Sequence, residues 1–286
     1  MRRALLALAV AGLAIGLTAC GVSNSIDPVA AAATKSQSAG GFKTSLKLSV
    51  TANGQRLTMT GHGTFGDKQG ELDIEMPDLL GRLGAASGTD MTMKALYVTE
   101  DGDPVMYMQL GLLSGQLPGG KTWMRIDLAK AGKAAGIDLG QLMGGAGQNP
   151  SDWLALLRSN GEFSEVGHET VDGADTTRYH GTVDLEKAAA GDGPAAATIK
   201  RLLDLGAPTK YPLDVWVDGA GYIRQFEMSY DETLSGSTVS MSMSMIMSMS
   251  DYGTTIDFSA PPADQVFDAT DLAAQGAASA LNGTTH

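Results

Sequence analysis

The chain has 286 residues, one cysteine, and 32 acidic against 20 basic side chains, which gives a net charge of −12. This length suffices for one large or two modest domains with a proper core, and a lone cysteine excludes an intramolecular disulfide framework. Because the charge is negative and no basic cluster is interleaved with aromatic residues, nucleic acid is excluded as a partner.

The N-terminal segment is typical of an export signal that ends in a lipidated cysteine. Arg2 and Arg3 precede an apolar run, and Leu17-Thr18-Ala19-Cys20 resembles the lipobox of bacterial lipoproteins. The apolar run is shorter than the roughly 20 residues of a membrane-spanning helix. We expect residues 1–19 to be a signal peptide and Cys20 to carry acyl chains such as palmitate. Cleavage by an ordinary signal peptidase, with Cys20 incidental, is the alternative.

Both ends of the mature chain are rich in small and polar residues. We expect residues 20–41 to be a lipidated N-terminus and tether, in which Asp27-Pro28 caps a short helix. We expect residues 271–286 to be a flexible tail. Residues 42–270 would then form a single domain.

Period-two alternation of apolar and polar residues dominates this domain, and it predicts antiparallel strands joined by hairpins. Asn53-Gly54 and several Asp-Gly pairs mark the tight turns. The strands are expected at Thr44–Thr51, Arg56–Phe65, Glu71–Met76, Met91–Thr99, Val105–Leu110, Thr122–Asp127, Gly161–Glu169, Ala174–Leu185, Leu213–Val217, Tyr222–Thr233, Ser237–Asp251 and Thr254–Ser259.

Helical patterns are confined to three further places. Asn149-Pro150-Ser151-Asp152 is a start signal for a helix over Trp153–Arg158. Ala195–Leu205 is the second candidate, and Leu128–Met143, broken at Gly136, is the third.

The longest predicted strand carries a row of methionines. Met241, Met243, Met245, Met247 and Met249 alternate with mostly serine, so an extended strand projects all five from one face. Two interpretations remain open: an ordinary core strand beneath a helix, or a flexible wall that adapts to apolar chains of varying shape. Copper binding is disfavoured, because it normally gathers thioethers in a small cluster with His or Cys.

Eight further methionines lie in other predicted strands, on faces that parity alone cannot assign. They would make the interior more deformable, because Met is unbranched and flexible. They are Met59, Met76, Met91, Met93, Met106, Met108, Met124 and Met228.

Motifs for catalysis are weak. Residues 61–66 spell a dinucleotide fingerprint, but they end a strand and do not open a helix, so the glycines indicate close approach or sheet curvature. His168 and His180 are expected to face each other across a hairpin, where a site shared with Glu165 or Glu169 is conceivable, although cross-strand surface pairing is the simpler interpretation. Asp101-Gly102-Asp103 lacks the rest of a calcium loop.

The sequence resembles the LppX/LprAFG lipoprotein family over nearly the whole mature chain. Besides the lipobox, the matching segments are Val166-Gly167-His168-Glu169-Thr170-Val171-Asp172-Gly173, Tyr179-His180-Gly181, Pro212-Leu213-Asp214-Val215-Trp216-Val217-Asp218, Gly221-Tyr222-Ile223-Arg224, and Tyr252-Gly253 before Ile256. This resemblance implies an α+β fold: a strongly curved antiparallel half-barrel with a few helices on its concave face, similar to the carriers LolA and LolB. It also implies an acylated lipid held between sheet and helices, and no catalytic residues.

The resulting hypothesis is a lipoprotein that Cys20 anchors to the extracytoplasmic face of the cell membrane and that carries acylated lipids or glycolipids across the envelope. An envelope lipid transporter is an expected partner, and no cofactor, metal or enzymatic activity is expected. A structural or signalling lipoprotein with a self-filled core, and an envelope hydrolase, are the alternatives. The candidates for the cavity wall are Met241, Met243, Met245, Met247, Met249, Trp153, Leu154, Leu157, Ile199, Leu202 and Leu203.

Overall fold

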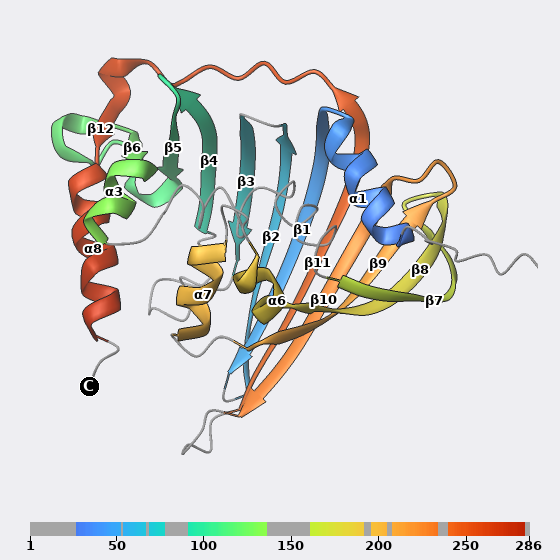
Figure 1. Cartoon of the computed structure of the whole chain (residues 1–286). Coiled ribbons are helices and arrows are strands. Elements are labelled where there is room, and N and C mark those ends of the chain that lie inside the picture. The colour runs from blue at the N-terminus through green and yellow to red at the C-terminus, as the bar shows by residue number, and fades with distance from the viewer. Residues whose placement is uncertain are drawn as a thin grey trace, which may run out of the picture.

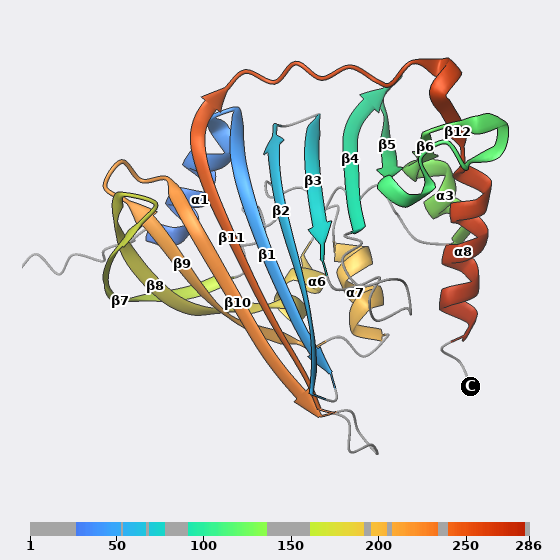
Figure 2. The same ribbon diagram turned by 180° about the vertical axis from the view of Figure 1, so that it is seen from behind.

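A computed structural model describes residues 27–52, 54–66, 69–77, 91–135, 161–191, 196–204, 208–233 and 240–283. Within these ranges, twelve strands form one sheet that curves strongly and does not close (Figures 1 and 2). Helices lie on one side of this sheet. The expected α+β half-barrel is therefore confirmed.

The strands follow one another around the sheet in two meanders that meet in its middle. The order is β12-β6-β5-β4-β3-β2-β1-β11-β10-β9-β8-β7, and neighbours are antiparallel except β12 and β6. The bounds are β1 Gly41–Ala52, β2 Gln55–Phe65, β3 Gly70–Met76, β4 Met91–Glu100, β5 Asp103–Leu110, β6 Trp123–Asp127, β7 Gly161–Val171, β8 Ala174–Asp184, β9 Lys210–Asp218, β10 Ile223–Thr233, β11 Ser240–Thr254 and β12 Val266–Asp268.

Tight turns set the register of the hairpins. Asp101 and Gly102 both have positive φ (52° and 93°), as do Asp172 and Gly173 (48° and 80°). Two consecutive left-handed residues match the twist of the flanking strands, and Asp and Gly adopt that conformation at low cost. The Asp-Gly pairs seen in the sequence thus form the expected reversals.

Helix α1 (Pro28–Ser38) begins where the sequence predicts, because Asp27 caps it. The Asp27 carboxylate accepts hydrogen bonds from the backbone N–H groups of Val29 and Ala30. Val29 is fully buried, so α1 is docked on the sheet. The remaining helices are α3 Leu128–Ala135, α6 Leu185–Ala190, α7 Ala196–Asp204 and α8 Thr270–Gly283, with short 3-10 turns η1 Gly111–Leu113, η2 Pro118–Gly120 and η3 Ala263–Gln265. None of these described helices is long and apolar enough to span a bilayer.

Three expectations about local structure are wrong. The stretch from residue 271 forms α8 instead of a flexible tail, because its small side chains, such as Ala273 and Ala274, pack with α3 over β6. Residues 255–262 cross over the sheet without joining it, and the chain pairs again only at β12. Leu185 begins α6 and does not end a strand, since Asp184 caps the helix through the Lys187 N–H.

The hydrophobic core lies mainly between the sheet and the helices. Its largest cluster joins α1, α6 and α7 to β8–β11 and to Phe42, Phe65 and Leu72 of β1–β3, and a second cluster joins α3 and α8 to β5 and β6. A small third cluster around Leu96 and Val105 lies on the opposite face of β4–β6. We call the face that bears the helices the inner face and the opposite one the outer face.

Candidate functional site

The register of the sheet assigns every described strand methionine to the inner face. Leu48 lies opposite both Met245 and Met59, and Met228 lies opposite Met245 on the other side. Directly paired residues of antiparallel strands point the same way, so this parity carries across the sheet. Twelve methionines share it: Met59, Met76, Met91, Met93, Met106, Met108, Met124, Met228, Met243, Met245, Met247 and Met249.

The methionine row of β11 divides into two parts. Met249 and Met247 are 1% and 5% exposed, and they belong to the core cluster that contains Phe42 and Phe226. Met243 and Met245 are only partly buried beside this cluster. The core interpretation therefore holds for the end of the row near Thr254. At the other end, the side chains of Met243 and Met245 keep solvent-accessible surface.

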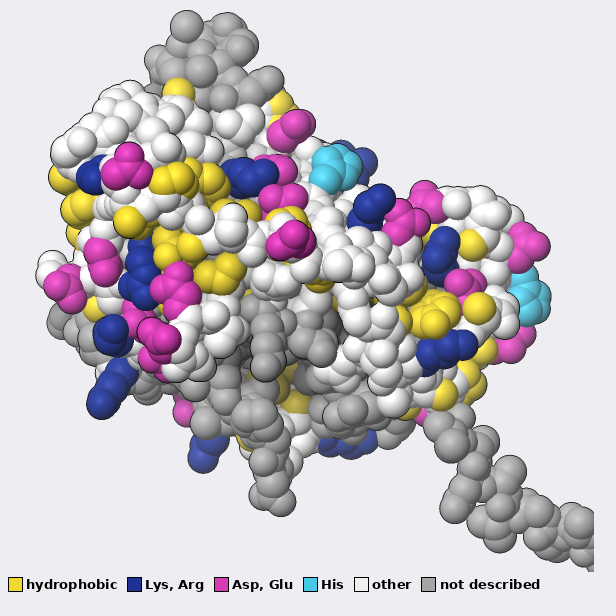
Figure 3. All heavy atoms as spheres, turned by 90° about the horizontal axis from the view of Figure 1, so that it is seen from above, with side chains coloured by type: hydrophobic (Ala, Val, Ile, Leu, Met, Phe, Trp, Pro, Cys, Tyr) yellow, Lys and Arg dark blue, Asp and Glu magenta, His cyan; other side chains and the backbone are white. Residues whose placement is uncertain are grey.

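The middle of the inner face carries further apolar side chains that are only half-buried. Helix α1 packs against β7, β9 and β10 near one end of the sheet, and α3 and α8 pack against β5 and β6 near the other; α6 packs against β9, and α7 packs against α6. From above, hydrophobic side chains are visible in the hollow on the helix side (Figure 3). The half-buried residues of the middle strands are Leu46, Leu48, Val50, Leu57, Met59, Ile74, Met91, Met93, Met243 and Met245.

Two of the expected cavity residues on helices belong to the core cluster that also contains methionines of β11. Ile199 is 5% exposed and Leu203 is partly buried, and both belong to the cluster of Met247. The side chains of Met241 and Leu202 lie outside the described residues, as do Cys20, Trp153, Leu154 and Leu157. For these the role in a cavity or anchor stays a prediction.

Sequence reasoning missed the contribution of strands β1–β4 to this face. The alternation of Leu46, Leu48 and Val50 was visible, but alternation does not say which face is inner. The pairing of β1 with the methionine strand, about 200 residues away in the chain, supplies that information.

Glycines of β2 allow the strands to approach closely, as expected from their place in a strand. A Cβ atom on Gly63 would lie 2.3 Å from the carbonyl oxygen of Glu71, and one on Gly61 would lie 3.3 Å from that of Asp73. The fingerprint-like residues 61–66 thus serve the packing of β2 on β3.

The two histidines of the β7–β8 hairpin do not form a shared site. His168 lies opposite Thr177, whereas His180 lies opposite Asp214 on the outer face, at a register position of opposite parity. His168 contacts Glu165 (3.5 Å), and His180 contacts Asp214 (3.1 Å). The two-residue turn between Val171 and Ala174 sets a register that pairs His168 with Thr177 and His180 with Ser164, so the expectation that the two histidines face each other is wrong. In the described ranges, no three His, Cys, Asp or Glu side chains gather as metal ligands.

A network of charged side chains joins β4, β6 and β12 at one end of the sheet. Arg125 binds Glu100 (2.9 Å) and approaches Asp268 (3.5 Å). Burial raises the pKa of Glu100, but hydrogen bonds from Tyr107 and Arg125 outweigh it, so the pKa is lowered. The pKa of the buried Asp127 carboxyl is likewise lowered, because Lys130 hydrogen bonds outweigh desolvation. These groups stabilise structure and are separate from the inner face.

The fold and its inner face define the class: an α+β protein whose open, curved sheet presents a methionine-rich apolar face to its helices. No family model matches the chain. An uncharacterized 31.2 kDa protein of Streptomyces griseus is 29% identical over 266 residues, which cover 88% of this chain and 82% of that protein.

Solved structures with similarity to the chain include two mycobacterial proteins, LprF and the lipoprotein LppX. LprF of Mycobacterium bovis is 10% identical, with a TM-score of 0.40 and coverage of 82% of this chain and 95% of LprF. LppX of Mycobacterium tuberculosis is 14% identical, with a TM-score of 0.33 and coverage of 81% and 98%. Both carry names of the family that the sequence motifs resemble.

Proposed function

We propose that the protein is an envelope lipoprotein that holds the acyl chains of a lipid or glycolipid against the middle of its inner face and carries the lipid across the envelope. The observation that carries this proposal is the set of half-buried apolar side chains on β1–β4 and β11, between the helices at the two ends of the sheet. An acyl chain would complete the burial that these side chains lack.

The chemistry of the face suits a hydrocarbon ligand. Methionine is unbranched and re-packs around contents of irregular shape. Each buried methylene contributes about 0.8 kcal/mol, so a sixteen-carbon chain would contribute on the order of 12 kcal/mol before ordering and association costs. A ligand bound in this way needs no reaction, and the proposal includes none.

The proposed anchor agrees with the position of α1. Only six residues separate Cys20 from Asp27, where the helix starts. At about 3.5 Å per extended residue they reach roughly 25 Å. Acylation of Cys20 would therefore hold the β7–β10 end of the sheet, on which α1 packs, near the membrane surface.

One observation favours a second candidate, a structural lipoprotein with a self-filled core. Met247 and Met249 are packed as tightly as ordinary core residues. Such a protein would use the same fold without any ligand.

Native mass spectrometry of the full chain purified from its membrane distinguishes the two. We expect an additional mass besides the anchor, lost on solvent extraction and identified as an acylated lipid by lipidomics. A single species with only the anchor mass, before and after extraction, would refute lipid carriage and support the self-filled core.

A further inference from the structure

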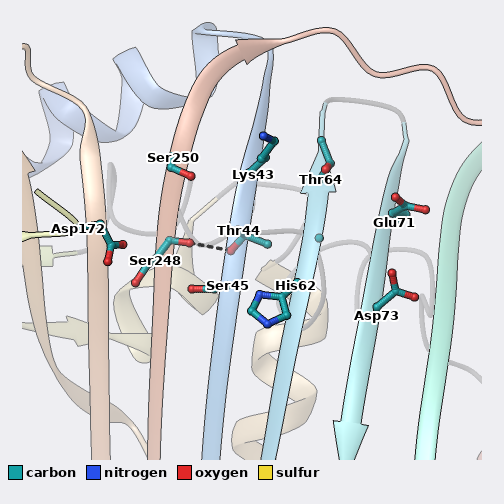
Figure 4. A pocket seen from close by; sticks show the side chains of 11 residues that line it. Lys43, Thr44, Ser45, His62, Thr64, Glu71, Asp73, Asp172, Ser248 and Ser250 are labelled. Carbon is teal, nitrogen blue, oxygen red and sulfur yellow. Dashed lines mark hydrogen bonds between the residues drawn. The ribbon is translucent and has the colours of Figure 1, made fainter. Parts of the chain in front are cut away.

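A second concave site lies on the outer face, away from the acyl-chain face. It is an open pocket of about 370 Å³ across β11, β1, β2 and β3, near the Asp172 turn (Figure 4). Polar residues line it: Lys43, Thr44, Ser45, His62, Thr64, Glu71, Asp73, Asp172, Ser248 and Ser250, together with Gly63. Charged and histidine side chains are prominent along the outer face (Figure 3).

The residues around the pocket meet because of register. Ser248 pairs with Ser45, Ser45 with His62, and His62 with Asp73. These four side chains form one row across the sheet, all at outward positions. Strands β1, β2 and β3 follow one another as a meander, and β11 joins them from a distant part of the chain.

Some of the charged side chains in this lining already form ion pairs within the protein. Lys43 forms an ion pair with Asp251 (2.8 Å), and Lys94 binds both Glu71 (3.1 Å) and Asp73 (3.5 Å). The Lys43 charge is thus balanced. The pocket offers no uncompensated cation that would attract a phosphate or another anion.

Other side chains of the lining keep their hydrogen-bonding capacity. Within the described ranges, the structure records no hydrogen bond or ion pair made by the side chains of Ser45, His62, Thr64, Asp172 and Ser250. They combine hydroxyl groups, an imidazole and a carboxylate, which donate as well as accept. The set is suited to a ligand that presents both functions at several points.

We infer that this outer pocket binds a small, neutral, hydroxyl-rich ligand, namely a sugar unit. Its polar lining disfavours an acyl chain, and its excess of carboxylates disfavours an anion. Its volume is at the small end of the range of ligand sites, which is about 300–1,000 Å³. The same sugar chemistry occurs in a free glycan and in a glycolipid headgroup.

The inferred site is independent of the proposed lipid site. The sheet separates them, because His62 and Ser45 point to the face opposite Gly61 and Leu46. A change in one site should leave the other intact.

Two pocket variants of the full chain test the inference. His62 and Asp172 are exposed, so His62→Ala and Asp172→Asn should preserve the fold. Asn also tolerates the positive φ of 48° at position 172. The matched control is Glu75→Gln, an exposed side chain on the outer face of β3 that does not line the pocket.

Saturation-transfer NMR and calorimetry would measure binding of methyl glucoside, methyl mannoside and chitobiose, and vesicles with a glycolipid would represent a membrane-held headgroup. We expect millimolar binding of at least one probe, weakened about tenfold or more by either pocket variant and unchanged in Glu75→Gln. Binding of only the free sugars or only the vesicles would identify the source. No binding of any probe, or binding that both pocket variants leave unchanged, would overturn the inference. Lipid content is expected to be equal in all variants, which separates failure here from failure of lipid carriage.

Discussion

Replacing Met245 by tryptophan distinguishes a filled interior from one that a ligand completes. Met245 is half-buried on the inner face, between Leu48 of β1 and Met228 of β10. In an interior that is already packed, a larger side chain forces strain of about 1–3 kcal/mol. If unfilled space adjoins Met245, the indole occupies it and the unfolding free energy of the lipid-free protein changes by roughly 0–1 kcal/mol.

The same substitution should impair lipid binding. An indole that displaces about three methylenes of an acyl chain removes about 2.4 kcal/mol, or roughly fifty-fold in affinity. The matched control is Met247→Trp, two residues along the same face. Met247 is 5% exposed and pairs with Phe226 and Leu46, so overpacking there should cost the full 1–3 kcal/mol.

Urea unfolding of the extracted proteins gives the free energies, and titration with a fluorescent fatty acid gives the affinities. We expect Met245→Trp to be nearly as stable as the natural protein and deficient in binding. If Met245→Trp loses as much stability as Met247→Trp while its fatty-acid affinity is unchanged, the inner face is self-filled and our reasoning fails.

Three further predictions concern the stability of the fold. Ser36→Ala should cost about 1–3 kcal/mol in urea unfolding, because the fully buried hydroxyl accepts the Ile223 N–H (2.9 Å); a loss below 0.5 kcal/mol would contradict this. Gly63→Ala should lower the melting temperature, since its Cβ would lie 2.3 Å from a backbone oxygen, whereas Gly167→Ala, with nothing within 4 Å, should not. Because the pKa of Asp127 is lowered in the folded state, its contribution to stability is present above about pH 4 and lost as pH falls below it. Asp127→Asn should flatten that acid limb of the unfolding free energy, and an unchanged limb would argue against the assignment.

Most strands could be predicted because their determinants are local. Alternating residues such as Leu46, Leu48 and Val50 need one buried face, and turns such as Asp101-Gly102 need residues that accept positive φ. These requirements act over a few residues, so the sequence displays them directly. The Asp27 cap of α1 is local in the same way.

Elements held by distant contacts could not be predicted in this way. Helix α8 has many small residues and a weakly amphipathic pattern, and its packing on α3 stabilises it. Strand β12 has three residues and exists because β6, more than 130 residues earlier, offers a free edge. Neither contact leaves a signal in the nearby sequence.

In the candidate site, too, some features depend on local sequence and others on contacts between distant parts of the chain. Residue order by itself determined that the methionines of β11 share a face, since side chains in a strand alternate with period two. It could not determine that methionines on six other strands join them there. Face assignment requires the register between strands, and only the tertiary structure decides that, because hydrogen bonds between strands far apart in the chain set it.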